Sequence, residues 1–187
     1  MKKVVIVFMC LLVNACAVGT KINYSAGNIP LAHKSYNFDG GCKISVVDKR
    51  PYVLSGRKAS NFVGIRRGGY GNPFNVVTTS GQSLADDLTS LFTVSFNIDG
   101  RSRCNLDGDN IRKELVYELN EWKTDVMIRG RLLYDVDTTI IVDGEQAAKI
   151  NTVGNIVISR KYKLHEAVEE AFNSIHSKPE IVSALSM

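Results

Sequence analysis

The alternating pattern over residues 131–142 constrains the fold of this chain more than any other feature. Every second residue is apolar or a threonine, whereas charged residues and threonine occupy much of the opposite face, which is the period of a half-buried strand. Asp143-Gly144 follows directly, and this pair favours a type I′ turn because both positions require a positive φ. The sequence therefore predicts an antiparallel hairpin whose second strand covers 145–153.

Further segments predict the rest of a two-layer fold. Residues 42–48 and 115–122 also alternate between apolar and polar positions, so we expect two more strands there. Apolar residues at helical spacing predict a helix over 81–99 and a closing helix over 164–175. The predicted fold class is therefore α+β: a two-layer sandwich whose mainly antiparallel sheet of about four to five strands has two helices packed on one face. The stripe of the first helix consists of Leu84, Leu88, Leu91 and Phe92.

The N-terminus has the features of an export signal. Lys2 and Lys3 precede an apolar run over residues 4–13, which is too short to span a bilayer as a helix but has the length of a secretory signal's apolar region. The next residues resemble the lipobox of bacterial lipoproteins, which implies that Cys16 is diacylated and becomes the mature N-terminus. An ordinary cleaved signal and a buried strand are the alternatives. The motif reads Val13-Asn14-Ala15-Cys16.

Three regions follow from this interpretation. Residues 1–15 are the lipoprotein signal peptide. Residues 16–41 are the lipidated N-terminus and a flexible tether, because they lack periodicity and are rich in Gly, Ser, Asn and Ala. Residues 42–187 are a single α+β periplasmic domain, long enough to bury one core.

Charge and cysteine content narrow the classes of function. Removal of Lys2 and Lys3 lowers the 23 Lys and Arg residues to 21, against 19 Asp and Glu, and this balance is too even to favour nucleic acid as a partner. Export places the chain in an oxidising compartment, where Cys42 and Cys104 are left unmodified once Cys16 is lipidated. These two residues either form a disulfide or are small buried hydrophobic residues in strands.

Residues 51–79 predict a long loop with many glycines, and loops of this length in a compact domain are often functional. Arg66, Arg67 and Tyr70 lie within it, and Arg50 directly precedes it. Arginine binds carboxylates and phosphates through paired hydrogen bonds and stacks on rings, so we predict that these four residues form a binding loop. Peptidoglycan peptides, lipid A phosphates or an acidic partner protein would suit it. The alternative is a solvated loop whose glycines serve turns.

The chemical motifs favour no enzyme. Among the histidines His33, His165 and His176, the last two would lie roughly 16 Å apart along one helix, so they cannot share a metal ion. The sequence holds no Cys-x-x-Cys pair, no Gly-x-Ser-x-Gly motif and no phosphate-binding P-loop. Asp135 and Asp137 share a strand face, where they could act as acid and base or simply solvate the face. We predict a protein that is not an enzyme and binds no cofactor or metal.

The whole pattern resembles the YajG-like family of uncharacterised bacterial lipoproteins. This resemblance implies an α+β envelope lipoprotein of unknown activity and supplies no catalytic residues. Because Ala17 follows the cysteine, the resemblance also implies an anchor at the periplasmic face of the outer membrane. It is carried by the lipobox, the strand over 44–50, the helix from Ser83, the strand around 132–136 and a closing helix with Ile181 and Leu185.

We therefore expect a lipid-anchored, palmitate-bearing envelope protein that acts as a non-enzymatic binding or scaffolding module in the periplasm. Its partners would be the membrane, through the lipid, and an envelope protein or peptidoglycan. The alternative is an accessory subunit of an oligomeric envelope machine for secretion, flagellar assembly or polysaccharide export, joined through sheet edges. A cell-wall hydrolase is the third hypothesis.

Overall fold

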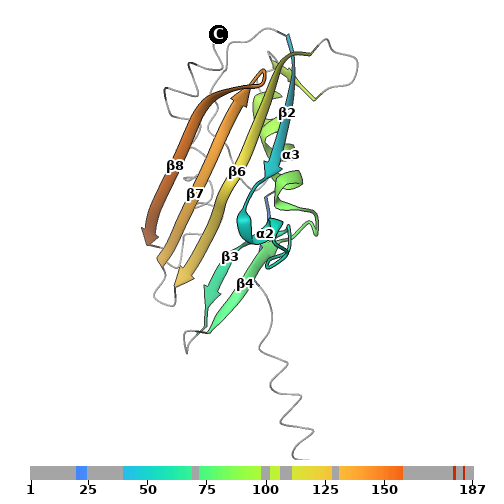
Figure 1. Ribbon diagram of the computed structural model, residues 1–187. Helices are drawn as coiled ribbons and strands as arrows, with labels where there is room; N and C mark the ends of the chain where they lie inside the picture. The colour runs from blue at the N-terminus through green and yellow to red at the C-terminus, as the bar shows by residue number, and fades with distance from the viewer. Residues whose placement is uncertain are drawn as a thin grey trace, which may run out of the picture.

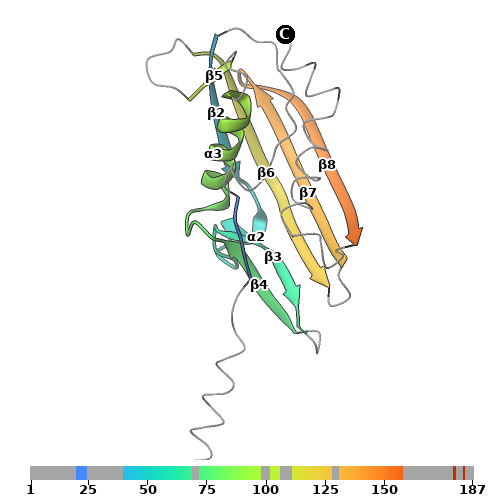
Figure 2. The ribbon, with the colours of Figure 1, turned by 180° about the vertical axis from the view of Figure 1, so that it is seen from behind.

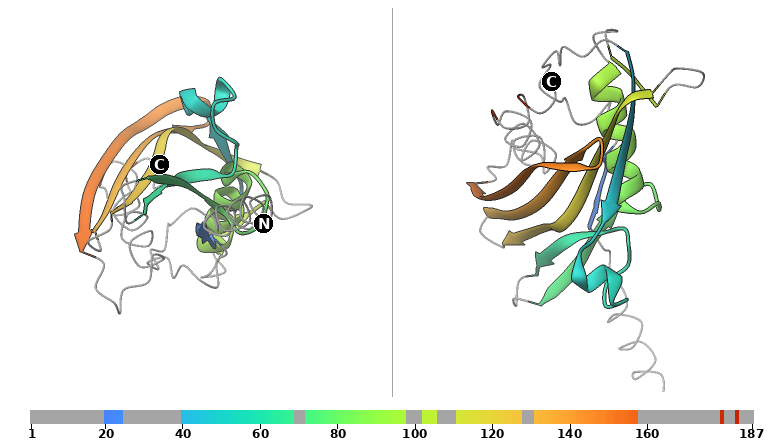
Figure 3. Two further views of the ribbon diagram at one scale, coloured as in Figure 1. Left: turned by 90° about the horizontal axis from the view of Figure 1, so that it is seen from below. Right: turned by 45° about the horizontal axis from the view of Figure 1, so that its top comes forward.

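The structure, a computed structural model, describes residues 20–24, 40–68, 72–97, 102–105, 111–127 and 131–157, together with Pro179 and Ser183. The described residues form an eight-stranded mixed sheet with the helices α2 and α3 (Figure 1). The sheet curves, and α3 lies on its concave side (Figure 3). The elements are β1 (Thr20–Ile22), β2 (Gly40–Asp48), α2 (Pro51–Leu54), β3 (Phe62–Arg67), β4 (Pro73–Thr78), α3 (Leu84–Asn97), β5 (Ser102–Cys104), β6 (Ile111–Met127), β7 (Arg131–Val142) and β8 (Glu145–Val157).

The sheet is built around β6. β7 pairs antiparallel along one edge of β6, and β8 continues the sheet beyond β7. Two strands share the other edge, because β2 pairs in parallel with the first part of β6 and β3 pairs in parallel with its last part. β4 and β1 follow β3, and β5 lies beside β2. The chain between β2 and β3 therefore bridges two strands that lie one after the other along β6.

This architecture shows that the predicted two-layer sandwich of four to five mainly antiparallel strands with two helices on one face is wrong. The sheet has eight strands and includes the parallel pairs β1–β4, β2–β5, β2–β6 and β3–β6. The main reason is that residues 51–79, predicted as a loop, form α2, β3 and β4. The predicted closing helix over 164–175 lies outside the described residues.

The predicted hairpin over β7 and β8 is confirmed. Asp143 and Gly144 have φ angles of 51° and 86°, as a type I′ turn requires. The predicted apolar face is also confirmed, since Leu132, Val136 and Ile140 are buried. The alternation and the turn therefore predict the hairpin correctly, although an irregularity between Ile140 and Ile141 shifts the register of the remaining pairs by one residue.

β8 continues to Val157, past its predicted end, because Gly154 accommodates an aromatic ring. The ring of Tyr134 lies across the strand at this point, and a Cβ atom on Gly154 would stand 2.0 Å from Tyr134 Cζ. A glycine in a strand often marks such a close approach. Gly154 therefore makes room for a side chain and does not interrupt the strand.

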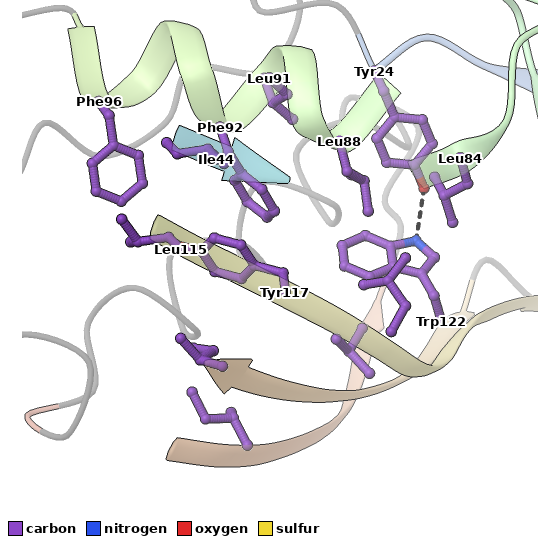
Figure 4. Packing of buried hydrophobic residues seen from close by; sticks show 14 of the residues in the cluster. Tyr24, Ile44, Leu84, Leu88, Leu91, Phe92, Phe96, Leu115, Tyr117 and Trp122 are labelled. Atoms are coloured by element: carbon purple, nitrogen blue, oxygen red, sulfur yellow. Dashed lines mark hydrogen bonds between the residues drawn. The ribbon is translucent and has the colours of Figure 1, made fainter. Parts of the chain in front are cut away.

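α3 packs on the concave face of the sheet and closes the core (Figures 2 and 4). Its predicted stripe is buried. Phe92 stacks on Tyr117 of β6 with ring centroids 4.5 Å apart. The helix begins later than predicted because Ser83 caps it: the backbone N–H of Asp86 donates a 3.1 Å hydrogen bond to Ser83 Oγ.

Residues 20–24 dock on the domain, although they lie within the predicted tether. β1 pairs in parallel with β4, with Thr20 beside Val76. Tyr24 is only 2% exposed, and its hydroxyl accepts a 3.0 Å hydrogen bond from Trp122 Nε1 (Figure 4). This part of the region predicted as a tether therefore adds a strand to the sheet and a side chain to the core.

Candidate functional site

Arg50, one of the four predicted binding residues, lies in the interior of the domain. Its side chain is fully buried at the break between β2 and β3. The guanidinium group donates two hydrogen bonds to the carboxylate of Asp48, of 2.8 Å from Nε and 2.6 Å from Nη2. Nη1 donates a 2.6 Å bond to the carbonyl oxygen of Phe62, and Nη2 donates a 3.1 Å bond to that of Ser60.

These contacts give Arg50 a structural role. Burial lowers the pKa of the guanidinium group, but the hydrogen bonds and the charge of Asp48 outweigh burial and hold the pKa above its ordinary value. The charge therefore persists and supplies donors to carbonyl groups at the break in the sheet. The side chain of Arg50 is enclosed in the interior, so it offers no donor at the surface of the described domain.

A second group of polar contacts surrounds a bulge in β6 between Leu119 and Glu121. The hydroxyl of Tyr52 donates to the carboxylate of Glu121, and burial together with this hydrogen bond raises the pKa of Tyr52. Burial also raises the pKa of Tyr24, more than the hydrogen bond from Trp122 lowers it. Both tyrosines therefore stay neutral at physiological pH and fix α2 and the N-terminal segment against β6.

The arginines predicted to act together do not form one binding surface. Arg67 donates hydrogen bonds to Asp125 of β6, the shortest of 2.7 Å, and this pairing raises the pKa of Arg67. Arg66 is exposed and points to the opposite face of β3, as successive strand residues do. Tyr70 lies outside the described residues. The predicted binding loop is thus a β hairpin whose arginines are separated.

The structure joins Cys42 of β2 and Cys104 of β5 in a disulfide, with Cα atoms 4.3 Å apart. Both residues are buried, and they are direct partners in the parallel register. The bond ties the short strand β5 to the edge of β2. Cys16, the predicted lipidation site, lies outside the described residues.

A hollow of about 410 Å³ lies on the outer face of β6, β7 and β8, the face that points away from α3. Most of its lining residues alternate with core residues along these strands, and we call it the outer-face hollow. Leu133 and Val153 are exposed there, by 36% and 70%. One row of the lining consists of Lys123, Asp135 and Val153 and the next of Asp125, Leu133 and Asn155, with Tyr134 and Gly154 completing it.

The charged residues of the hollow differ in their surroundings. Asp125 is held by Arg67, and Lys123 lies directly opposite Asp135 in the antiparallel register. Asp135 Oδ1 is buried and accepts no hydrogen bond within the described part of the chain. The hollow therefore combines exposed apolar side chains with an acceptor that an incoming N–H group could satisfy.

Asp135 and Asp137, which share one face as predicted, have different surroundings. The carboxylate of Asp137 lies 3.6 Å from Lys149 Nζ and accepts a 3.2 Å hydrogen bond from Asn120. Across the described ranges, no three histidine, cysteine or acidic residues are grouped as metal ligands. No helix in those ranges is long and apolar enough to cross a bilayer.

Sequence reasoning missed the outer-face hollow because its lining comes from three strands whose register is a property of the fold. One signal was present: over residues 131–137, Leu133 is apolar on a strand face that Arg131, Asp135 and Asp137 otherwise occupy. An apolar residue on the polar face of an amphipathic strand is a candidate for contact with another molecule.

Comparisons with known proteins identify the fold alone. No family model matches the chain, and no curated protein sequence matches it. Protein XCC0632 from Xanthomonas campestris, described as a DUF330 protein, is similar with a TM-score of 0.51 at 9% identity, over 90% of this chain and 94% of that one. An uncharacterized protein is similar with a TM-score of 0.45 at 11% identity, over 89% and 97% of the two chains. The resemblance to YajG-like lipoproteins remains a prediction.

Proposed function

We propose that this chain is a lipid-anchored cell-envelope protein that works as a non-enzymatic binding module and holds a partner protein at the outer-face hollow. The anchor is the diacyl group predicted at Cys16, and the location is the periplasmic face of the outer membrane. Support for the anchor comes from the signal-like residues 1–15, which end in a small residue before the cysteine. Several acyl chains on one cysteine hold a protein stably at a bilayer, whereas a single chain holds it weakly.

The outer-face hollow is the observation that carries the binding role. The exposed side chains of Leu133 and Val153 lie beside Asp135, whose buried oxygen has no donor within the described residues. An unpaired buried acceptor is costly, and a partner's N–H group would remove that cost. Aromatic and apolar contacts inside a polar rim are typical of protein interfaces. A polypeptide offers both the apolar side chains and the N–H donors that this hollow can use.

Photo-crosslinking in intact cells tests the proposal. A photoactivatable amino acid replaces Val153 in one variant, and Val94, an exposed valine on α3, in a matched control. We expect a distinct crosslinked protein from position 153 and none from position 94. Full burial of a valine contributes about 1.5–3 kcal/mol, so Val153→Asp should lower affinity capture of that protein roughly tenfold or more, and Val94→Asp should not. The same products from both positions would contradict the proposal.

The edge formed by β8 favours the second candidate, an accessory subunit of an oligomeric envelope machine. Within the described residues, β8 pairs only with β7, and its 13 residues include just two charged ones, Glu145 and Lys149. Long edges with few charges are templates for strand addition from another chain. The mass of the complex extracted intact from membranes decides this point: a multiple of the protomer mass supports the subunit, and a single protomer excludes it.

A further inference from the structure

The docked N-terminal segment limits how far the domain can lie from its lipid. Cys16, the proposed lipidation site, is four residues before Thr20, the first residue of β1. Four residues span at most about 14 Å even when fully extended. Because β1 is part of the sheet, the domain cannot move away from the bilayer on a long linker. The point at which the chain joins the sheet therefore decides which part of the domain lies next to the membrane.

The direction of β1 identifies that part. β1 runs parallel to β4 with Thr20 beside Val76, so the N-terminal end of β1 lies on the side on which β4 begins (Figure 2). Val76 is three residues, or about 10 Å, from Pro73 at the start of β4. β3 and β6 end on this side and β7 begins there, because Arg66 pairs beside Val126 and β6 is antiparallel to β7. We call this side the hairpin end, after the hairpin of β3 and β4 and not that of β7 and β8. It consists of Arg66, Arg67, Pro73, Phe74, Met127 and Arg131.

The side chains of the hairpin end have the chemistry of a membrane-contacting surface. Arg66 and Arg131 are exposed and lie on opposite faces of the sheet, so the two cations flank its end. Met127 is 37% exposed between them. Arginine binds phosphate oxygens through two parallel hydrogen bonds, and each basic residue near an anionic bilayer strengthens binding by about 1 kcal/mol, or roughly fivefold. The opposite end of β7 and β8 carries the exposed acids Asp143 and Glu145.

Given the lipid anchor at Cys16 on which this inference rests, we propose that the hairpin end lies on the bilayer and that Arg66 and Arg131 bind the phosphate groups of anionic lipids. The sheet then stands upright, with the turn between β7 and β8 about 40 Å from the headgroups, the length of a 12-residue strand. Leu133 lies two residues from Arg131, so the outer-face hollow is about 7 Å from the membrane-contacting end. A protein bound in the hollow would therefore also touch the membrane surface.

Fluorescence quenching from the bilayer surface tests this orientation. The mature acylated protein is purified from membranes and reconstituted in phosphatidylcholine vesicles that contain phosphatidylglycerol and a headgroup nitroxide. Asn72→Cys carries a fluorophore at the hairpin end, and Gln146→Cys carries it at the opposite end; both residues are exposed. We expect strong quenching at position 72 and none at position 146. We expect the quenching at position 72 to be weaker in the double variant Arg66→Gln/Arg131→Gln, and weaker for the unchanged arginines in vesicles of phosphatidylcholine alone.

The outcomes separate the orientation from the anchor. Equal quenching at the two positions overturns the membrane contact. Quenching at position 72 that persists without the arginines overturns the proposed binding of lipid phosphates by Arg66 and Arg131. Flotation of each sample with its vesicles reports the anchor independently of the fluorophore. A protein that floats but shows equal quenching retains the proposed anchor and loses the proposed orientation, whereas a protein that does not float overturns both. The emission of Trp122, which is buried, verifies that each variant is folded.

Discussion

Arg50 is the residue on which the junction of β2, β3 and β6 most depends. Its replacement by methionine would remove the guanidinium donors to the carboxylate of Asp48 and to the carbonyl groups of Phe62 and Ser60, and Asp48 would keep only the bond from the backbone N–H of residue 50 among these contacts. Removing one partner of a buried ion pair costs about 3–5 kcal/mol, because the remaining charge stays buried. We therefore expect Arg50→Met to lower the free energy of unfolding by about that amount, measured by urea denaturation.

The control for this experiment is Arg57→Met, since Arg57 is exposed and its Nε donates a 3.1 Å hydrogen bond to the hydroxyl of Ser55 at the surface. Surface substitutions of this kind usually change stability by less than about 0.5 kcal/mol. Equal losses for the two variants would mean that Arg50 contributes no more than an exposed arginine.

Gly64 and Gly154 both lie where a side chain would collide with a neighbouring strand, but the neighbours differ. A Cβ on Gly64 would stand 2.1 Å from the backbone oxygen of Thr124, whereas a Cβ on Gly154 would meet the ring of Tyr134. We expect Gly154→Ala to cost about 1–3 kcal/mol in unfolding free energy and Gly64→Ala to cost more, because backbone atoms cannot move aside.

A double-mutant cycle with Tyr134→Ala checks the physical reason. The two changes Gly154→Ala and Tyr134→Ala should be non-additive by at least about 0.5 kcal/mol, because removing the ring removes the collision. Gly144→Ala, at the turn between β7 and β8 and ten residues along the chain from Tyr134, should be additive with Tyr134→Ala. Additivity in both pairs would show that the ring does not occupy the space above Gly154.

Tyr24 makes the stability of the domain sensitive to alkaline pH. Its pKa in the folded protein is raised above the ordinary value of about 10, mainly by burial, so the unfolded chain releases the proton first. The stabilisation is complete below pH 10 and declines above it by about 1.4 kcal/mol per pH unit for this group. We expect the urea midpoint to fall steeply above about pH 10. Tyr24→Phe should reduce the slope of the unfolding free energy against pH by the contribution of one proton, about 1.4 kcal/mol per pH unit. An unchanged slope would show that Tyr24 titrates normally.

At the scale of elements, the disulfide decides how firmly β5 is held. Cys42 and Cys104 are 62 residues apart, and closing a loop of that length stabilises a fold by about 4 kcal/mol in the chain-entropy account. We expect a reducing agent, or the double variant Cys42→Ala/Cys104→Ala, to lower the free energy of unfolding by about 2–4 kcal/mol. The double variant should not respond to the reducing agent. Insensitivity of the natural protein to reduction would show that the bond is absent.

The elements that the sequence predicts well are those in which local signals agree. Over 131–142 the two-residue period, the Asp143-Gly144 turn and the β-branched residues all favour one hairpin, and the structure contains it. The stripe of α3 is correct for the same reason. The strands β3 and β4 were missed because glycines and arginines hide their alternation, and the parallel pairing of β3 with β6 is a long-range contact without a local signal.

The candidate site was harder to predict than the fold. Arg50 was assigned to a ligand because sequence alone cannot show that Asp48, two residues away, and the distant carbonyl group of Phe62 enclose it. The outer-face hollow depends on the register of three strands. The hollow is lined by apolar residues among alternating charged ones, and in the sequence this pattern is the same as that of an ordinary solvent-exposed strand face.

At the scale of the whole molecule, the proposed anchor and the fold are closely coupled. β1 begins four residues after Cys16, and Tyr24 completes the core against Trp122. A lipid at Cys16 would therefore be attached directly to the folded domain. The outer-face hollow would then have a fixed height above the bilayer, which is the physical basis for a scaffold that positions its partner.

The mass of the intact protein extracted from membranes tests the lipid anchor most directly. If the protein is anchored as proposed, its mature chain begins at Cys16 and contains 172 residues, which is 187 minus the 15 of the signal, with the added mass of its acyl chains. Cys16→Ser should abolish both the cleavage and the added mass. A mature chain of unmodified mass, or one that begins at another residue, would show that Cys16 carries no lipid.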